Sequence, residues 1–184
     1  MDNLVSWYTT TDGRLNRQPF WIGGLVLAVV QALLGLLVIP MLGIGSVDFA
    51  VLQSAISSGD MATVNTITAG AAQAGGWASL VLFLVFAYPI YALCVKRRHD
   101  RNSNGLDVVI YLALVVVLLL VQALGLGMSP TEVPGVGVLM MPTPLYSVLG
   151  AISGIFGLYL LVVMGFLKGT PGPNNYGPDP LGGN

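Results

Sequence analysis

Charged side chains are scarce in this sequence of 184 residues. Asp, Glu, Lys and Arg together make up only 8% of the chain, and hydrophobic residues make up 55%. A soluble domain carries about a quarter charged residues. The composition therefore excludes an ordinary soluble domain and indicates a membrane protein. We expect no nucleic-acid partner.

Cysteine and histidine are also nearly absent, with one of each in the chain. A single cysteine, Cys94, cannot form an intrachain disulfide. A protein metal site needs three or four ligands, and one histidine, His99, with scattered carboxylates is too few. No Ser or Cys has the setting of a nucleophile, so we predict no metal, no cofactor and no catalytic residue.

Four long stretches contain no charged residue, at 18–47, 61–95, 108–131 and 133–167. A membrane-spanning helix needs about 20 apolar residues, so each stretch can hold one. The fold class that this predicts is all-α: a four-span transmembrane bundle forming one integral membrane domain over 1–184, with a tail at 168–184. The spans are expected at about 20–42, 77–95, 107–127 and 145–167. The first apolar run is too long for a cleaved signal peptide, so we expect it to remain as an anchor.

Lys and Arg are missing from two of the segments between these spans. All seven basic residues fall before span one, between spans two and three, or after span four: Arg14, Arg17, Lys96, Arg97, Arg98, Arg101 and Lys168. Basic residues concentrate on the cytoplasmic side of a membrane. The pattern predicts that both termini and the central loop lie in the cytoplasm.

The two connections that lack Lys and Arg predict different structures. In the first, Ser46 would cap a short interfacial helix over 47–58 that ends at Gly59, and a helix from Met61 would lead into span two. The second, 128–144, is rich in proline and is expected to be ordered but not helical.

Other local patterns concern packing and helix ends. Small residues spaced four apart in span one (Gly24, Ala28 and Ala32) and in span four (Gly150 and Gly154) predict faces that pack on another helix, of this chain, a protein partner or a second copy. Asn104 and Asp107 resemble a capping box at the start of span three. Arg14 and Arg17 would share one helix face toward lipid headgroups, with Phe20 and Trp21 in the interfacial aromatic belt.

Three polar segments complete the sequence: "GRLNRQPFW", "VKRRHDRNSNG" and "GTPGPNNYGPDP". Their order and spacing resemble the domain-of-unknown-function 805 (DUF805) family of small bacterial inner-membrane proteins with about four spans. The matching residues are Gly13, Arg14, Arg17, Phe20 and Trp21, then Arg97, His99, Asp100 and Gly105, then Asn174, Tyr176, Gly177, Asp179 and Pro180. Where the family has Ser-Gly-Trp, this chain has Asn104-Gly105-Leu106. The resemblance implies an inner-membrane location and no known activity.

The polar residues leave several roles open. His99 and Asp100 would suit acid–base catalysis, but neighbours in a loop do not normally orient each other. The basic residues would attract anionic lipid headgroups or bind a specific anion. Transport by an oligomeric channel or carrier is the alternative, although no ionisable residue lies within the spans. We expect a non-enzymatic structural, accessory or regulatory membrane component.

The same segments predict a contact. We expect the three motifs to converge, Asp100 and Asp179 to pair with arginines, and the tail to pack against residues 96–105.

Overall fold

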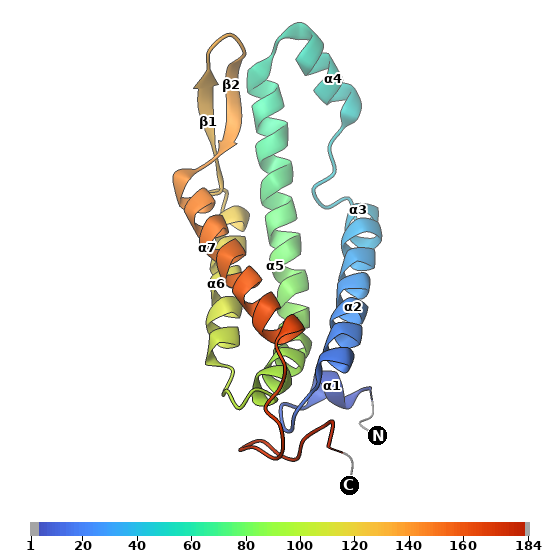
Figure 1. Cartoon of the computed structure of the whole chain (residues 1–184). Coiled ribbons are helices and arrows are strands. Elements are labelled where there is room, and N and C mark those ends of the chain that lie inside the picture. Colours follow the sequence, from blue (N-terminus) through green and yellow to red (C-terminus); the bar gives the residue numbers. More distant parts are fainter. Residues whose placement is uncertain (1–3, 183–184) are drawn as a thin grey trace. The chain divides into compact units, whose positions relative to one another are not determined.

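The structure is a computed structural model that describes residues 4–182 and is mostly helical (Figure 1). Its elements are α1 (Ser6–Thr9), α2 (Arg17–Leu33), η1 (Leu34–Val38), α3 (Ile39–Met41), α4 (Phe49–Ser58), α5 (Met61–His99), α6 (Leu106–Ala123), β1 (Met128–Val133), β2 (Gly137–Pro142), α7 (Pro144–Leu161) and η2 (Val162–Phe166). Within the described residues, four helices are long and apolar enough to cross a membrane: Arg17–Met41, Met61–His99, Leu106–Ala123 and Pro144–Phe166. The four predicted apolar helices are therefore confirmed.

Contacts group the chain into two compact units. Unit 1 comprises Met1–Ala32, Phe83–Leu114 and Ser153–Asn184, and unit 2 comprises Leu33–Leu82 and Val115–Ile152. Each of the four long helices contributes residues to both units. The prediction of one integral domain over 1–184 stays a prediction.

Unit 2 contains an antiparallel hairpin. The prediction of a purely helical fold is therefore wrong in this segment. Met128 on β1 lies opposite Pro142 on β2, and Val133 lies opposite Gly137. The prolines of this segment disfavour a helix, and Pro130 is tolerated because a two-stranded sheet has only edge strands. The prediction of an ordered, non-helical connection is confirmed.

The first connection is helical, but its cap differs from the predicted one. Asp48, not Ser46, starts α4: its carboxylate accepts hydrogen bonds from the N–H groups of Ala50 (2.9 Å) and Val51 (3.2 Å). Ser46 instead donates its hydroxyl to Gly43 O. Gly59 ends α4 with φ +74°, as predicted. Helix α5 then begins at Met61 and continues to His99, a length of roughly 58 Å at about 1.5 Å per residue.

Helix α6 ends at Ala123, four residues earlier than predicted. Gly125 takes φ +75°. The N–H groups of Gly125 and Leu126 then bond back to Gln122 O and Val121 O, at 3.0 and 2.9 Å. This pair of bonds satisfies the last carbonyls of a helix and stops it.

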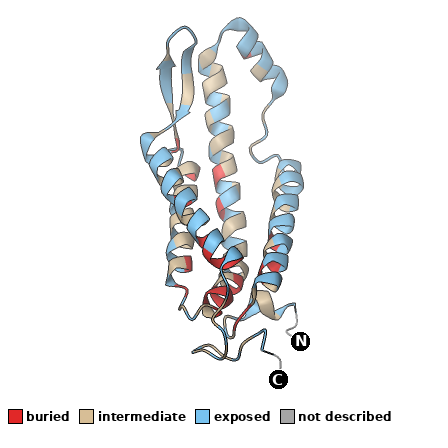
Figure 2. Ribbon diagram, in the orientation of Figure 1, coloured by how far each residue is buried: buried red, intermediate tan, exposed pale blue. Residues whose placement is uncertain are grey.

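The core of unit 1 joins four stretches of chain. Leu15, Phe20, Leu27, Leu93, Val108, Leu160 and Met164 form one buried cluster. Figure 2 shows the buried residues gathered where the end of α5 meets the neighbouring helix ends. Burial of this apolar surface fixes the helix ends that carry the polar motifs.

The small residue that packs closely in α2 is Gly23 rather than Gly24. A Cβ on Gly23 would lie 2.7 Å from Leu93 Cδ1, whereas a Cβ on Gly24, Gly150 or Gly154 would meet no atom within 4 Å among the described residues. The predicted stripes of span one and span four therefore do not pack closely within the described part of this chain. A protein partner or homo-oligomer at these faces stays a prediction.

Candidate functional site: a buried ion cluster at the helix ends of unit 1

The centre of the site is one carboxylate shared by two guanidinium groups. Asp100 Oδ1 accepts from Arg14 Nη2 (3.0 Å) and Nε (3.2 Å), and Asp100 Oδ2 pairs with Arg97 Nη1. The three side chains are only 1%, 0% and 4% exposed for Arg14, Arg97 and Asp100. We call these three residues the ion cluster. It links the segment before α2 to the end of α5, two of the three motif segments.

The second positive charge of the cluster is offset by carbonyl oxygens. Arg97 donates to Met164 O (2.7 Å) and Leu167 O (2.6 Å), where η2 ends. Unpaired carbonyls give a helix end partial negative charge, so this is a favourable place for a buried guanidinium. Arg14 donates to Thr170 O (2.6 Å) and Gly172 O (2.6 Å) in the tail. The two arginines thereby bring the third motif segment into the site.

Burial of Arg14 corrects two predictions. Arg14 lies in the irregular segment before α2, whereas Arg17 is the first residue of that helix, so the two do not share a helix face. Arg14 also points into the protein rather than toward lipid headgroups. Lys96, Arg97 and Arg98 are buried as well. The charge pattern identified where the basic residues concentrate but not which of them turn inward.

His99 is engaged with the backbone and with an aromatic ring, not with Asp100. Its Nδ1 lies 3.2 Å from Gly13 O, which favours a proton on that nitrogen. Its ring stacks on Tyr176 with centroids 3.8 Å apart and planes 7° apart. The carboxylate of Asp100 is meanwhile occupied by the arginines. No His–Asp acid–base pair forms in this geometry.

The tail packs against the central loop, as predicted. Thr170 N–H donates to Asp100 O (2.8 Å), and Asn174 Nδ2 donates to His99 O (2.9 Å). Asn174 and Gly177 also form a bridge that closes a tight turn around Tyr176. Gly177 takes φ +135°, a conformation that side chains rarely adopt. Pro180 and Pro178 both line a cavity beside the segment before α2.

Asp179 does not pair with an arginine among the described residues, contrary to the prediction. Its carboxylate instead accepts from the N–H groups of Gly172 (2.9 Å) and Leu181 (2.9 Å). These backbone hydrogen bonds lower the pKa of Asp179, because they stabilise the charged form. Asp179 therefore folds the tail on itself rather than joining the ion cluster.

The turn after α5 explains Gly105 and revises the cap of α6. Asn102 takes φ +56°, and Ser103 N–H bonds back to Arg98 O, which ends α5. Gly105 takes φ +72°, and a Cβ there would lie 2.8 Å from Val95 Cγ2. Asn104 accepts from Leu106 N–H (3.1 Å), but Asp107 pairs with Arg98 Nη2 (2.8 Å) and does not complete a capping box.

Trp21 and Arg17 lie beside the ion cluster rather than in it. Trp21 Nε1 donates to Gly165 O (3.1 Å), and Arg17 Nη1 donates to Phe166 O (3.1 Å). Both bonds tie the start of α2 to the end of η2. Trp21 remains 44% exposed beside Phe166, which suits the predicted aromatic belt, whereas Phe20, predicted to lie in the same belt, is buried in the core.

Sequence analysis missed two tail residues that complete the site. A Cβ on Gly169 would collide with the Asp100 carboxylate, so only glycine fits beside the ion cluster. Thr170 donates both its N–H and its hydroxyl to Asp100 O. The sequence feature that could have indicated these residues is the Gly-Thr-Pro run directly after the last apolar helix.

Within residues 4–182, no group of three His, Cys, Asp or Glu residues could hold a metal ion.

Four apolar helices with a buried polar cluster at their ends define a multi-pass helical membrane protein. A family model described as a protein of unknown function (DUF805) matches residues 8–178, nearly the whole chain. The chain belongs to this family, as its three motifs predicted. No curated protein and no solved structure matches it.

Proposed function

We propose that this chain is a non-catalytic multi-pass component of the bacterial inner membrane, with a structural, accessory or regulatory role. One observation carries the proposal: the buried polar side chains of the family motifs are used in contacts within the protein. Arg14, Arg97 and Asp100 satisfy one another and nearby carbonyls. A catalytic site would instead leave an acid, a base or a nucleophile facing substrate.

The proposed orientation places both termini and the turn at 100–105 in the cytoplasm. All seven basic residues belong to unit 1, and unit 2 has none. This asymmetry supports the orientation, because Lys and Arg are retained on the cytoplasmic side. An oligomeric channel or transporter stays the alternative: Gln122, one of the polar residues that a solute route would use, donates its amide to Ala72 O, but its side-chain oxygen is buried without a partner among the described residues.

Purification in mild detergent tests the proposal. Wild type and His99→Gln would be isolated side by side, and co-purifying proteins and small molecules identified by mass spectrometry. A component of an assembly retains the same stoichiometric protein partner in both forms. A small molecule that is chemically converted by wild type and not by His99→Gln would contradict the proposal.

A further inference from the structure

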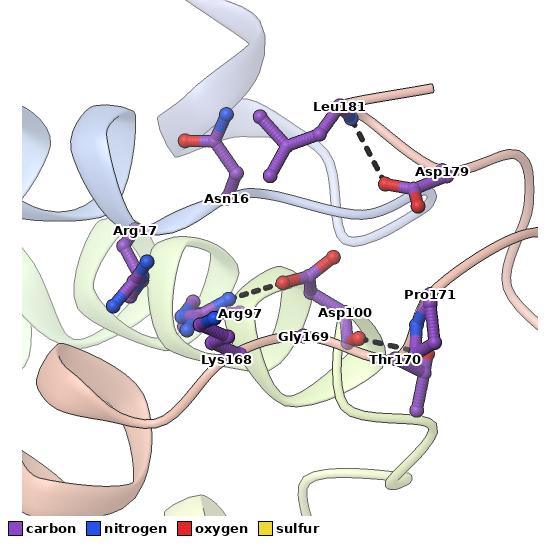
Figure 3. Close-up of a pocket in the computed structure, with 10 residues that line it drawn as sticks. All are labelled: Asn16, Arg17, Arg97, Asp100, Lys168, Gly169, Thr170, Pro171, Asp179 and Leu181. Carbon is purple, nitrogen blue, oxygen red and sulfur yellow. Dashed lines mark hydrogen bonds and ion pairs between the residues drawn. The ribbon is translucent and has the colours of Figure 1, made fainter.

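A groove runs beside the ion cluster between the start of α2 and the tail. One cavity of about 350 Å³ is lined by Arg17, Arg97, Lys168, Asp179 and neighbouring residues (Figure 3). A second, of about 420 Å³, is lined by Gln18, Trp21 and Gly165 among others. The two cavities share Asn16, Arg17 and Leu181. They are therefore adjacent, and together we call them the groove, with a polar part and an aromatic part.

The polar part has two cations, Arg17 and Lys168, with N–H groups left to bind an anion. Arg17, Arg97 and Lys168 cluster on one side of the cavity in Figure 3, and Asp179 lies on the other. Both carboxylates of the lining are already engaged, Asp100 by two guanidinium groups and Asp179 by backbone N–H groups. Among residues 4–182 the exposed Lys168 ammonium has no hydrogen-bond or ion-pair partner, and Arg17 uses one N–H group on Phe166 O.

The aromatic part lies next to apolar helices. Arg17 is the first residue of α2, and Lys168 follows η2 by two residues. Trp21 lies one turn after Arg17 in α2, and Phe166 is the last residue of η2. Their side chains are 44% and 60% exposed. A small soluble phosphate would need only the polar part. The pairing of an anion site with an exposed apolar surface fits an amphiphile.

We propose that this groove binds the phosphate group of a membrane phospholipid through Arg17 and Lys168, with an acyl chain passing Trp21. The ion cluster fixes the groove, because Asp100 and Arg97 form its wall and Gly169 brings Lys168 beside them. Arg97 adds positive potential at the phosphate position while it keeps its hydrogen bonds to Met164 O and Leu167 O. This inference rests on the proposed membrane location but not on a non-catalytic role.

Native mass spectrometry of the full chain in mild detergent tests the site. Phosphatidylglycerol, phosphatidylcholine and inorganic phosphate would be titrated separately. We expect one phosphatidylglycerol to be retained per chain. Each basic residue contributes about 1 kcal/mol to an anionic lipid, so Lys168→Gln is expected to weaken binding about fivefold and Arg17→Gln with Lys168→Gln about 25-fold.

Arg98→Gln is the matched control, because it removes the same charge outside both cavities and its side chain pairs with Asp107 rather than with a residue of the groove. We expect a change below about twofold. Equal weakening by Arg98→Gln and Lys168→Gln would overturn the site in favour of general charge attraction. Displacement of the lipid by equimolar inorganic phosphate would overturn the lipid assignment. Either result would leave the partner and His99 tests of the proposed function unaffected.

Discussion

Among single residues, Asp100 has the largest role at the polar end of unit 1. It is buried and pairs with two buried guanidinium groups. Its main-chain oxygen accepts a hydrogen bond from Thr170 N–H. Removing one partner of a buried ion pair leaves the other charges uncompensated, which costs about 3–5 kcal/mol. The arginines could not move to water without unpacking the helix ends.

The variant Asp100→Asn is therefore expected to destabilise the protein by about 3–5 kcal/mol, because it removes the charge but keeps the shape. Thermal unfolding in detergent measures the loss. Asp107→Asn is the comparison: the Arg98–Asp107 pair is more exposed (10% and 20%) and Asp107 pairs with one guanidinium group rather than two, so a smaller loss is expected. Equal losses in both variants would show that Asp100 has no special role.

Gly169 is required by proximity rather than by backbone conformation. A Cβ there would lie 2.6 Å from Asp100 Cγ, and Asp100 is held from the other side by both arginines. Gly169→Ala is expected to lower the free energy of unfolding by about 1–3 kcal/mol, as overpacking does. Gly154→Ala, where a Cβ meets nothing within 4 Å, should be neutral or slightly stabilising in the same thermal assay. The reverse order would disprove this account.

At the level of elements, helix starts show what a sequence can and cannot predict. Gly59 and the helix from Met61 follow from strong local signals. Ser46 and Asp48 both precede an apolar run and are both good caps, so residue type alone does not choose between them. The helix begins at Phe49, so Asp48 stands directly before its first residue and Ser46 does not.

Asp48→Ala is therefore expected to weaken the first turn of α4 by about 1 kcal/mol, whereas Ser46→Ala should not. The measurement is hydrogen exchange at the amides of Ala50 and Val51, which donate to the Asp48 carboxylate. We expect both amides to exchange faster in Asp48→Ala, with amides near Gly59 unchanged. Faster exchange of these amides in Ser46→Ala would instead identify Ser46 as the cap, as the sequence predicted.

The polar site was harder to predict than the helices. Apolar run lengths identify spans because the thickness of a bilayer sets them. The three motifs also indicated that Asp100 meets an arginine. Charge type did not indicate that Arg14 is buried or that Asp179 bonds to backbone N–H groups. Those outcomes depend on the path of the tail, which only tertiary contacts determine.

For the whole molecule, basic residues are confined to one of the two units. Unit 1 contains every Lys and Arg, while the charged residues of unit 2 are Asp48, Asp60 and Glu132. A membrane orientation with the connections at 42–60 and 124–143 outside places no basic group across the bilayer. The opposite orientation would require translocation of all seven.

Cysteine labelling tests this orientation directly. In a Cys94→Ser background, single cysteines would be introduced by Gln53→Cys, Thr131→Cys, Gln18→Cys and Asn175→Cys, all at exposed positions. A membrane-impermeant maleimide added to spheroplasts, which lack the outer-membrane barrier, should label the first two and not the last two, because basic segments stay in the cytoplasm. Permeabilised cells, in which all four should react, provide the control for reactivity. Labelling of Asn175→Cys in sealed spheroplasts would invert the topology and move the lipid groove to the outer leaflet.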